Sequence, residues 1–530
     1  MKLFRILLIS ALCLGQAFAQ KHAPANWFNL DFKADKVWGV STEKAYKELS
    51  LDKNTNKVIV AVIDAGTDID HEDLKANLWI NPKEVAGNQV DDDKNGYVDD
   101  VYGWCFIGSS KGTVNADTYE YSRILGSYYQ KGLKPGDTPV FKSNAEKDLF
   151  FDALALQEKT FKTTQQQYLQ FSMIMDKLKE MIAKTGSENP TKKQLKAIKV
   201  DTKQDKQLKK ILVMMAKKGP VYDSPLMKQL KQAESQMKTM MEVNLNTGAD
   251  TRYLVGDNYE DVTEKFYGSP KVNIPDMDHG THVAGIIAAN RSNKEGIKGI
   301  CNNALIMTLK VVPNGDERDK DVANAIRYAA DNGAKVINMS FGKKLSPNKS
   351  AVDEAIVYAM GKDVLFVHAA GNEGENLAEN PFYPMRKLNN GTTVPNWIEV
   401  GALGWQKGKK GRVADFSNYG KGEVDLFAPG VDIESTMPGS VYKQESGTSM
   451  ASPVVAGVAA LVRQNYPNLT AVQTKQILLI SAVPCEEEVL KPGTDETTTL
   501  KELCATGGVV NAYEALILAE KVSTGKVKLP

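Results

Sequence analysis

Three polar side chains stand at points of the sequence where packing alone would not place them. Asp64 ends the apolar run Val58 to Ile63, which is typical of a buried strand, and a buried carboxylate needs a partner. His279 lies in the small-residue segment DHGTHVAGIIAA, and Ser449 opens the apolar segment SMASPVVAGVAALV. The chemistry these residue types allow is that of a carboxylate that needs a partner, an imidazole that could act as a base, and a hydroxyl at a helix start that favours a developing negative charge.

Each of these positions also has a plainer interpretation. His71 is the histidine nearest to Asp64 in sequence, but it lies in the turn DIDHEDL, where capping and packing are its expected tasks. His282 follows His279 by three residues and is expected to be structural, because one base is enough. Ser449 could be an ordinary helix N-cap. The glycine and alanine around it favour instead the close approach of another backbone.

The elements that must position these side chains alternate between apolar runs and helical stretches. This alternation predicts an α/β fold, a three-layer sandwich with a mostly parallel central sheet. Functional groups gather at the carboxyl ends of such strands. That position suits Asp64 and also Asn372, which lies in the loop HAAGNEG and could donate its amide to an oxyanion or simply complete a turn. The expected strands are 58–63, 304–311, 335–339, 364–367, 399–400 and 424–427, and the expected helices include 285–289, 319–331, 350–360 and 451–464.

The order Asp, His, Ser and the residues around each member resemble the subtilisin-like serine peptidase family. The motifs are VIDAG, HGTHVAG and GTSMASP, and AAGN resembles the family's oxyanion-hole loop. The similarity covers about Lys57 to Phe106 and Asp257 to Glu520. It implies a nucleophile at Ser449, a general base at His279, an orienting carboxylate at Asp64 and an oxyanion donor at Asn372.

The resemblance also implies protein or peptide substrates and an exported serine endopeptidase that works through an acyl-enzyme. The segment NMSFG would pair with the substrate backbone, and AAG would line the pocket for the residue before the scissile bond. Simple strand packing would use the same residues. The implied substrate-binding residues are Ser340, Phe341, Gly342, Ala369, Ala370 and Gly371.

An acidic stretch, NQVDDDKNGYVDDVYGW, has positions 1, 3, 5, 6 and 9 of a calcium loop. Position 12 is Tyr102 rather than a bidentate glutamate, so the stretch is not a complete EF-hand, and a plain acidic turn is the alternative. Similar peptidases often bind calcium for stability, which implies a structural ion and no catalytic cofactor. The expected ligands are Asp91, Asp93, Asn95, Tyr97 and Asp99, with Tyr97 supplying its backbone carbonyl.

Residues 107–256 interrupt the α/β pattern with an expected all-α insertion. Its long helices are expected at 145–184, 192–218 and 225–243, and residues 141–247 carry 20 Lys or Arg against 12 Asp or Glu. Few aromatic residues accompany these lysines, which favours a solvated face over a nucleic-acid site. We expect the insertion to act as a lid, a substrate selector or an arm that binds a protein partner.

The first 19 residues have the pattern of a secretory signal peptide. Lys2 and Arg5 precede an apolar run that ends in the cleavage pattern Ala17-Phe18-Ala19. A lipid anchor at Cys13 is the alternative, although such sites usually follow a small residue. No later run of 18 apolar residues predicts a membrane span. The expected organisation is a signal peptide (1–19), a peptidase domain in two parts (20–106 and 257–530) and the helical insertion (107–256), in an extracellular or periplasmic protein.

Charge and cysteine content limit the partners further. The net charge of +1 predicts no nucleic acid or other polyanion as a partner of the whole chain. Four cysteines follow the signal peptide, and an exported chain could join Cys485 to Cys504, with free thiols as the alternative. Two other functions stay open: a catalytically silent scaffold that only binds, and an adaptor that works through its helical insertion.

Overall fold

The computed structural model describes residues 23–51 and 54–530, which form two compact units. The larger unit comprises Ala23–Glu120 and Asp250–Pro530, and the helical unit comprises Tyr121–Ala249. The expected signal peptide lies outside the described residues. Within the described ranges, no helix is both long and apolar enough to cross a membrane.

The larger unit is built on a nine-stranded sheet with the order β12-β15-β9-β8-β7-β6-β1-β5-β2. Neighbouring strands are parallel except for β12 and β15. The strands are β1 (Val58–Asp64), β2 (Gly103–Cys105), β5 (Ala304–Lys310), β6 (Val336–Met339), β7 (Leu365–Ala369), β8 (Trp397–Leu403), β9 (Leu426–Pro429), β12 (Val483–Pro484) and β15 (Gly508–Val509).

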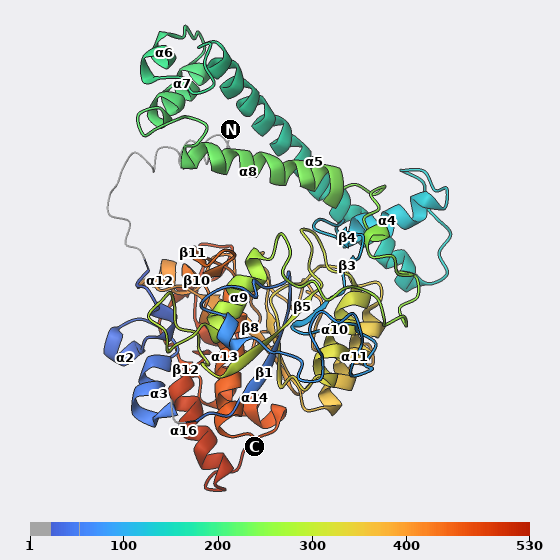
Figure 1. Cartoon of the computed structure of the whole chain (residues 1–530), viewed down its shortest axis with the longest axis vertical. Helices are drawn as coiled ribbons and strands as arrows, with labels where there is room; N and C mark the ends of the chain where they lie inside the picture. Colours follow the sequence, from blue (N-terminus) through green and yellow to red (C-terminus); the bar gives the residue numbers. More distant parts are fainter. Residues whose placement is uncertain (1–22, 52–53) are drawn as a thin grey trace. The chain divides into compact units, whose positions relative to one another are not determined.

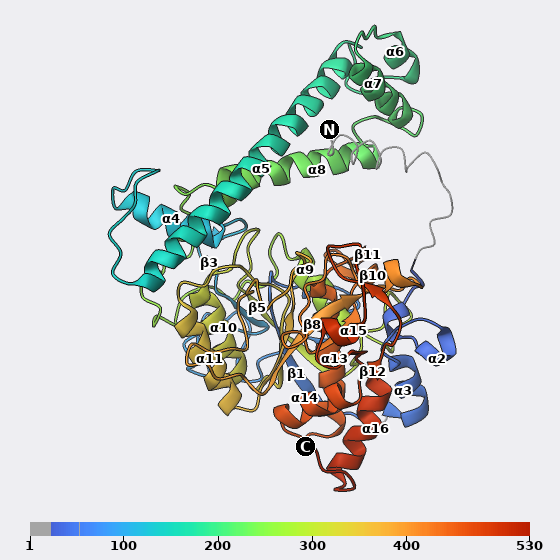
Figure 2. The same ribbon diagram turned by 180° about the vertical axis from the view of Figure 1, so that it is seen from behind.

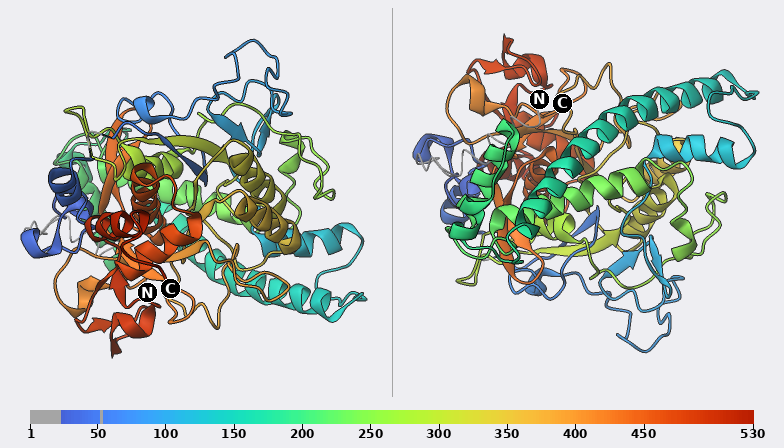
Figure 3. Two further views of the ribbon diagram at one scale, coloured as in Figure 1. Left: turned by 90° about the horizontal axis from the view of Figure 1, so that it is seen from below. Right: turned by 90° about the horizontal axis from the view of Figure 1, so that it is seen from above.

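Helices cover both faces of this sheet, because successive residues of each strand point to opposite sides. Val60 and Val62 of β1 pack in one core with α9 (Asp278–Ala288) and α13 (Thr448–Asn465). The alternate residues of the same strand pack in a second core with α10 (Asp319–Asp331) and α11 (Lys349–Gly361). The two sets of helices lie apart from one another in Figures 1 and 3. The expected three-layer α/β sandwich is confirmed.

Further elements complete the larger unit. Residues of α3 (Thr42–Leu49), α14 (Ala471–Ile480) and α16 (Ala512–Ser523) join the core of α13, and Figure 2 shows α14 and α16 close to it. The hairpin of β10 (Ile433–Met437) and β11 (Val441–Glu445) packs against α9. The short elements are α2 (Phe32–Asp35), β3 (Gly108–Ser109), β4 (Gly112–Thr113), α12 (Lys409–Arg412), β13 (Val489–Leu490), β14 (Thr497–Thr498) and α15 (Leu500–Leu503), with single 3₁₀ turns at Trp27–Asn29, Lys75–Asn77 and Arg252–Leu254.

The helical unit has its own apolar core, formed by α5 (Asn144–Ala183), α6 (Lys192–Ala197), α7 (Lys203–Met215) and α8 (Pro225–Thr239). The expected single helix 192–218 is wrong: it is two helices, and the side chain of Thr202 accepts the N–H of Asp205 to begin the second. Residues 107–120 and 250–256 belong to the larger unit. The helices are α4 (Glu120–Gln130, which starts at the boundary), α5 (Asn144–Ala183), α6 (Lys192–Ala197), α7 (Lys203–Met215) and α8 (Pro225–Thr239), followed by a π-helical turn at Met240–Asn244.

The disulfide between Cys485 and Cys504 is not formed. The four cysteines of the described residues are free and buried. Cys485 and Cys504 share an apolar cluster with Val489, Leu500 and Leu503. Burial raises the pKa of both thiols, so they act as small apolar side chains rather than as nucleophiles.

The separate core of the helical unit predicts separate stability. Leu212 is fully buried there, whereas Leu169 is 57% exposed. We expect Leu212→Ala to lower the free energy of unfolding of the helical unit by about 2–5 kcal/mol, because it removes packed methyl groups. Circular dichroism should register the loss. Tryptophan fluorescence should not, since all six tryptophans lie in the larger unit. Leu169→Ala is the control, and equal effects of the two substitutions would contradict an independent core.

Candidate active site

A hydrogen bond joins Asp64 to His279 across 215 positions of sequence. His279 Nδ1 lies 2.7 Å from Asp64 Oδ1, at the carboxyl end of β1. The same carboxylate oxygen accepts the N–H of Ala65 at 2.7 Å, and Asp64 is only 1% exposed. Because Nδ1 donates to the carboxylate, the neutral ring keeps its lone pair on Nε2. The buried charge at the strand end therefore has a partner that it also orients.

The glycine after His279 makes this pairing possible. A methyl group added at Gly280 would lie 2.0 Å from the carbonyl oxygen of Gly66 and 3.3 Å from Cβ of Asp64. Any side chain at position 280 would push the first turn of α9 away from the end of β1. The glycine in the motif HGTH is thus required for the close packing of α9 against the end of β1.

The surroundings of His279 favour its charged form. Burial lowers the pKa of the imidazole, but the charge and hydrogen bond of Asp64 more than offset that effect, and Glu445 adds to it. The pKa of His279 is therefore raised above its ordinary value of 6.5. The ring can accept a proton while Asp64 stabilises the cation that results.

Two other histidines, His282 and His71, have structural roles. His282 is buried, and its Nε2 lies 3.0 Å from the carbonyl oxygens of Ile433 and Lys443 in the β10-β11 hairpin. Burial lowers the pKa of His282 to about 4, so the ring is neutral. His71 is also buried, and its Nδ1 accepts the N–H of Asp73 at 3.1 Å.

Ser449 lies in the first turn of α13, where Ser340 contacts it twice. Its hydroxyl donates to the carbonyl of Ser340 at 3.1 Å, and its own carbonyl accepts the Ser340 hydroxyl at 2.9 Å. That carbonyl is available because Pro453, four residues on, has no N–H to donate to it. No hydrogen bond joins Ser449 to His279 in the structure described, so the Ser449 hydroxyl must turn from Ser340 to reach the imidazole.

Asn372 presents its amide nitrogen rather than its oxygen. Its Oδ1 accepts the backbone N–H of Thr448 at 2.8 Å and the Thr448 hydroxyl at 3.0 Å. The reverse orientation would set two N–H groups against each other. Nδ2 is thereby left as a donor at the mouth of α13.

These side chains share one cavity of about 310 Å³. His279, Asn372 and Ser449 line it, together with Glu445 and Met450. Asp64 lies behind His279, to which it is bonded. The structure therefore brings together all four residues that were expected to be catalytic.

The residues expected to bind substrate lie beside this cavity at the ends of two paired strands. Ser340, Phe341 and Gly342 follow β6, and Ala369 ends the neighbouring strand β7, followed by Ala370 and Gly371. His368, on β7, contacts the carbonyl of Phe341 through Nε2 at 2.9 Å and the carboxylate of Glu399 through Nδ1 at 2.7 Å. The two segments are thus fixed to each other.

Comparison with known proteins agrees with this geometry. Residues 55–507 match the model of the Subtilase family. The chain belongs to the subtilase family. It is 44% identical over 192 residues to a thermophilic serine proteinase from Bacillus sp. (strain AK1), covering 36% of this chain and 44% of that protein. It is 38% identical over 221 residues to subtilisin DY from Bacillus licheniformis, covering 41% and 74%.

Several of these relatives are matched over only part of their length. The chain spans about half of the alkaline protease of Alkalihalobacillus alcalophilus, at 41% identity over 202 residues, 38% of this chain and 48% of that one. Among solved structures, proteases from Pseudoalteromonas arctica PAMC 21717 match with a TM-score of 0.46 and 20% identity over 93% of this chain and 97% of that one. A cold adapted subtilisin-like serine proteinase matches with a TM-score of 0.34 and 34% identity over 43% and 74%.

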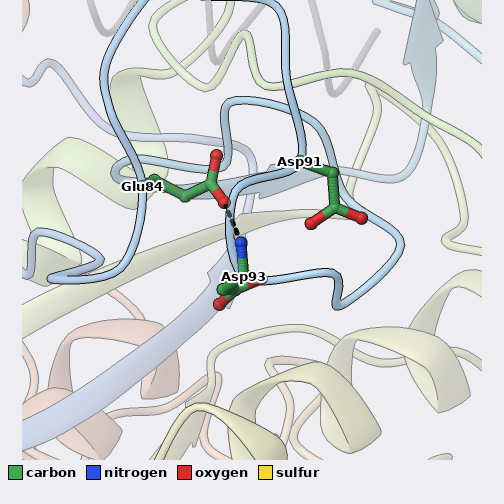
Figure 4. Close-up of side chains that lie close together, drawn as sticks. All are labelled: Glu84, Asp91 and Asp93. Carbon is green, nitrogen blue, oxygen red and sulfur yellow. Dashed lines mark hydrogen bonds between the residues drawn. The ribbon is translucent and has the colours of Figure 1, made fainter.

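The acidic loop of this subtilase gathers three carboxylates. Glu84, Asp91 and Asp93 each offer one oxygen, and these atoms lie within 4.8 Å of one another (Figure 4). Hard oxygen donors of this kind suit calcium. The expected side-chain ligands all accept backbone N–H groups within the loop: Asp91 and Asp93 accept that of Asn95, Asn95 Oδ1 accepts that of Tyr97, and the oxygens of Asp99 accept those of Gly87 and Gln89. The side chain of Tyr97 is buried among aromatic rings.

Sequence reasoning placed Ser340 among the substrate-binding residues, but it did not identify its contact with Ser449 or several other contacts that complete these sites. The hydroxyls of Ser340 and Thr448 orient Ser449 and Asn372, and Glu84 joins the acidic cluster from outside the calcium-loop spacing. Pro453 was the available signal for the contact at Ser449, because a proline inside a helix frees the carbonyl four residues earlier. The other partners come from distant segments and have no local signal.

The electrostatics of the site predict distinct histidine titrations. NMR of the intact chain, which has five histidines, should give His279 a pKa above 6.5 and keep His282 neutral down to about pH 4. Asp64→Asn should move the pKa of His279 below 6.5, since burial then dominates. Asp70→Asn, which changes a carboxylate bonded to Asn273, should leave it unchanged. A His279 pKa that does not respond to Asp64→Asn would contradict the pairing.

Proposed function

We propose that the chain is a serine endopeptidase that hydrolyses peptide bonds through an acyl-enzyme. The observation that carries the proposal is the Asp64–His279 hydrogen bond beside a cavity lined by Ser449 and Asn372. Family membership supports the same chemistry. Export to the extracellular space or periplasm is part of the proposal and rests on the pattern of residues 1–19.

The first step forms the acyl-enzyme. Ser449 Oγ bonds to the carbonyl carbon of the substrate while its proton moves to Nε2 of His279. The imidazolium gives that proton to the amide nitrogen as the C–N bond breaks, and the amine leaves. Water then attacks the ester by the same route and restores the Ser449 hydroxyl. Since only neutral His279 can act as base, activity is lost as the pH falls through its raised pKa.

The oxyanion formed in each step needs donors that are already in place. Nδ2 of Asn372 is oriented by Thr448 before substrate binds, so no reorganisation is needed during the reaction. The backbone N–H of Ser449, in the first turn of α13, is the second donor. Loss of one such donor typically lowers turnover by about 10²–10³.

The hypothesis of a catalytically silent scaffold is less favoured. A protein that only binds has no need of a buried carboxylate paired to a half-exposed imidazole, which costs desolvation energy. It also has no need of an asparagine whose oxygen is bonded so that its nitrogen is free to donate.

Covalent labelling separates the two functions. A fluorophosphonate should react with the native chain and not with Ser449→Ala, because only an activated serine attacks phosphorus. Ser523→Ala, which removes an exposed hydroxyl on α16, should label as the native chain does. Absence of labelling in a folded native chain that also cleaves no peptide would refute the proposal.

We also propose that the acidic loop binds a structural calcium ion. Glu84, Asp91 and Asp93 would hold it, and the two positive charges of the ion would offset most of the negative charge of the three carboxylates. Asn95, Tyr97 and Asp99, the other expected ligands, would contribute by shaping the loop. The ion would take no part in the reaction.

Thermal unfolding tests the calcium proposal. Millimolar calcium should raise the melting temperature relative to chelator, because a ligand that binds only the folded state at 100 times its Kd stabilises it by about 2.7 kcal/mol. The shift should disappear in Asp91→Asn. It should persist in Asp92→Asn, which alters a neighbouring exposed carboxylate outside the cluster. Equal melting temperatures in calcium and chelator would overturn the assignment.

A further inference from the structure

The ring of Phe382 occupies the space between the two segments proposed to bind substrate. A methyl group added at Gly342 would lie 2.3 Å from Cε1 of Phe382, and one added at Gly371 would lie 3.3 Å from the same atom. Carbon atoms in contact normally lie about 3.5–4.0 Å apart. The ring therefore packs closely against the backbone of Gly342. At Gly371 it contributes from one side only, because Asn418 Nδ2 and Glu373 Oε2 would lie closer to the added methyl group, at 2.4 and 2.7 Å. The ring comes from a loop that neither segment belongs to.

This space lies next to the reacting serine. Ser340, two residues before Gly342, exchanges hydrogen bonds with Ser449. Gly371 precedes Asn372, and its N–H donates to the Thr448 hydroxyl at 3.1 Å. In the proposed peptidase, we therefore expect the side chain before the scissile bond to lie between these two segments, where it would meet the ring.

The backbone around Phe382 is held firmly. Tyr383 exchanges two hydrogen bonds with Lys343, at 2.8 and 2.9 Å, so the loop pairs directly with the segment after Gly342. Lys343 is itself buried and forms ion pairs with Glu120 at 2.5 Å and Asp319 at 2.8 Å. The anchor next to the ring is thus a buried charged cluster rather than a free loop.

The ring also has neighbours behind and beside it. The imidazole of His368 lies 6.0 Å from it between centroids, and that imidazole is fixed by Phe341 and Glu399. The ammonium of Lys344 lies 5.8 Å from the ring centroid and pairs with Glu375 at 2.6 Å. The space that a large substrate side chain would need is therefore occupied by a half-buried ring with contacts on several sides.

We propose that Phe382 is a specificity-determining residue that limits the residue before the scissile bond to a small side chain. The substrate class is peptides and proteins with glycine, alanine or serine at that position. The proposal rests on the proposed peptidase function. It assigns the selectivity to a side chain, because the ring of Phe382 provides the three atoms nearest to the space above Gly342.

Peptides that differ only in the residue before the scissile bond test this assignment. For the native chain, kcat/KM should be at least about tenfold higher with alanine than with phenylalanine, since even one excess methylene in a fitted pocket changes rates by about 10–200-fold. Phe382→Ala should raise kcat/KM for the phenylalanine peptide at least about tenfold and change that for the alanine peptide far less. Phe382→Leu should fall between the two. Phe151→Ala, an exposed phenylalanine of the helical unit, should keep the native preference.

Labelling rates give the same comparison without turnover. A peptidyl phosphonate with a methyl side chain next to phosphorus should label the native chain faster than one with a benzyl side chain. In Phe382→Ala the two reagents should label at similar rates. Equal labelling of the native chain by both reagents, or an unchanged ratio in Phe382→Ala, would overturn the assignment while leaving the peptidase function intact. If tryptophan fluorescence shows that Phe382→Ala does not fold, the ratio of the two labelling rates in Phe382→Leu decides whether the ring sets the preference. Failure of both reagents and of all peptides would overturn the proposed function and this assignment with it.

Discussion

A carboxylate buried at the end of a central strand is the constraint on which the site depends. Asp64 is almost fully buried, and an ionised group in that position is costly unless it is hydrogen-bonded. Its partner must come from an element that reaches the end of β1, and α9 does so because Gly280 allows backbone contact. Both elements belong to one core, so the 214 intervening positions, most of them in a separately packed unit, leave the pair intact.

The first turn of α13 joins the rest of the site to that pair. Pro453 frees the carbonyl of Ser449 for the Ser340 hydroxyl, and Thr448 directs the amide of Asn372. These contacts link the ends of β6 and β7 to one helix. Asp64 therefore comes from a strand end, and His279 and Ser449 come from helix starts, where backbone geometry fixes position, whereas Asn372 lies in the loop after β7 and is held by Thr448.

How much the sequence could predict depends on whether an interaction joins residues close together or far apart along the chain. The apolar run of β1 and the motifs around Asp64, His279 and Ser449 are local patterns, and they predicted both the sandwich and the residues that meet in the cavity. The break between α6 and α7 was missed because a threonine cap interrupts an otherwise helical composition. Partners brought together only by folding, such as Glu84, have no local pattern. The disulfide expected between Cys485 and Cys504 was wrong. Both thiols are free and buried, and they pack in one apolar cluster without a covalent bond.

Chemistry and selectivity depend on different parts of this fold. Asp64, His279 and Ser449 lie on β1, α9 and α13, and side chains of all three elements pack in one apolar core. The pocket beside them is bounded by two glycines and by a ring from the loop between β7 and β8. A loop side chain can change volume without moving either strand end, because the hydrogen bonds of Tyr383 to Lys343 involve only backbone atoms. The size of the accepted side chain can therefore vary while the geometry of the hydroxyl, imidazole and carboxylate stays the same.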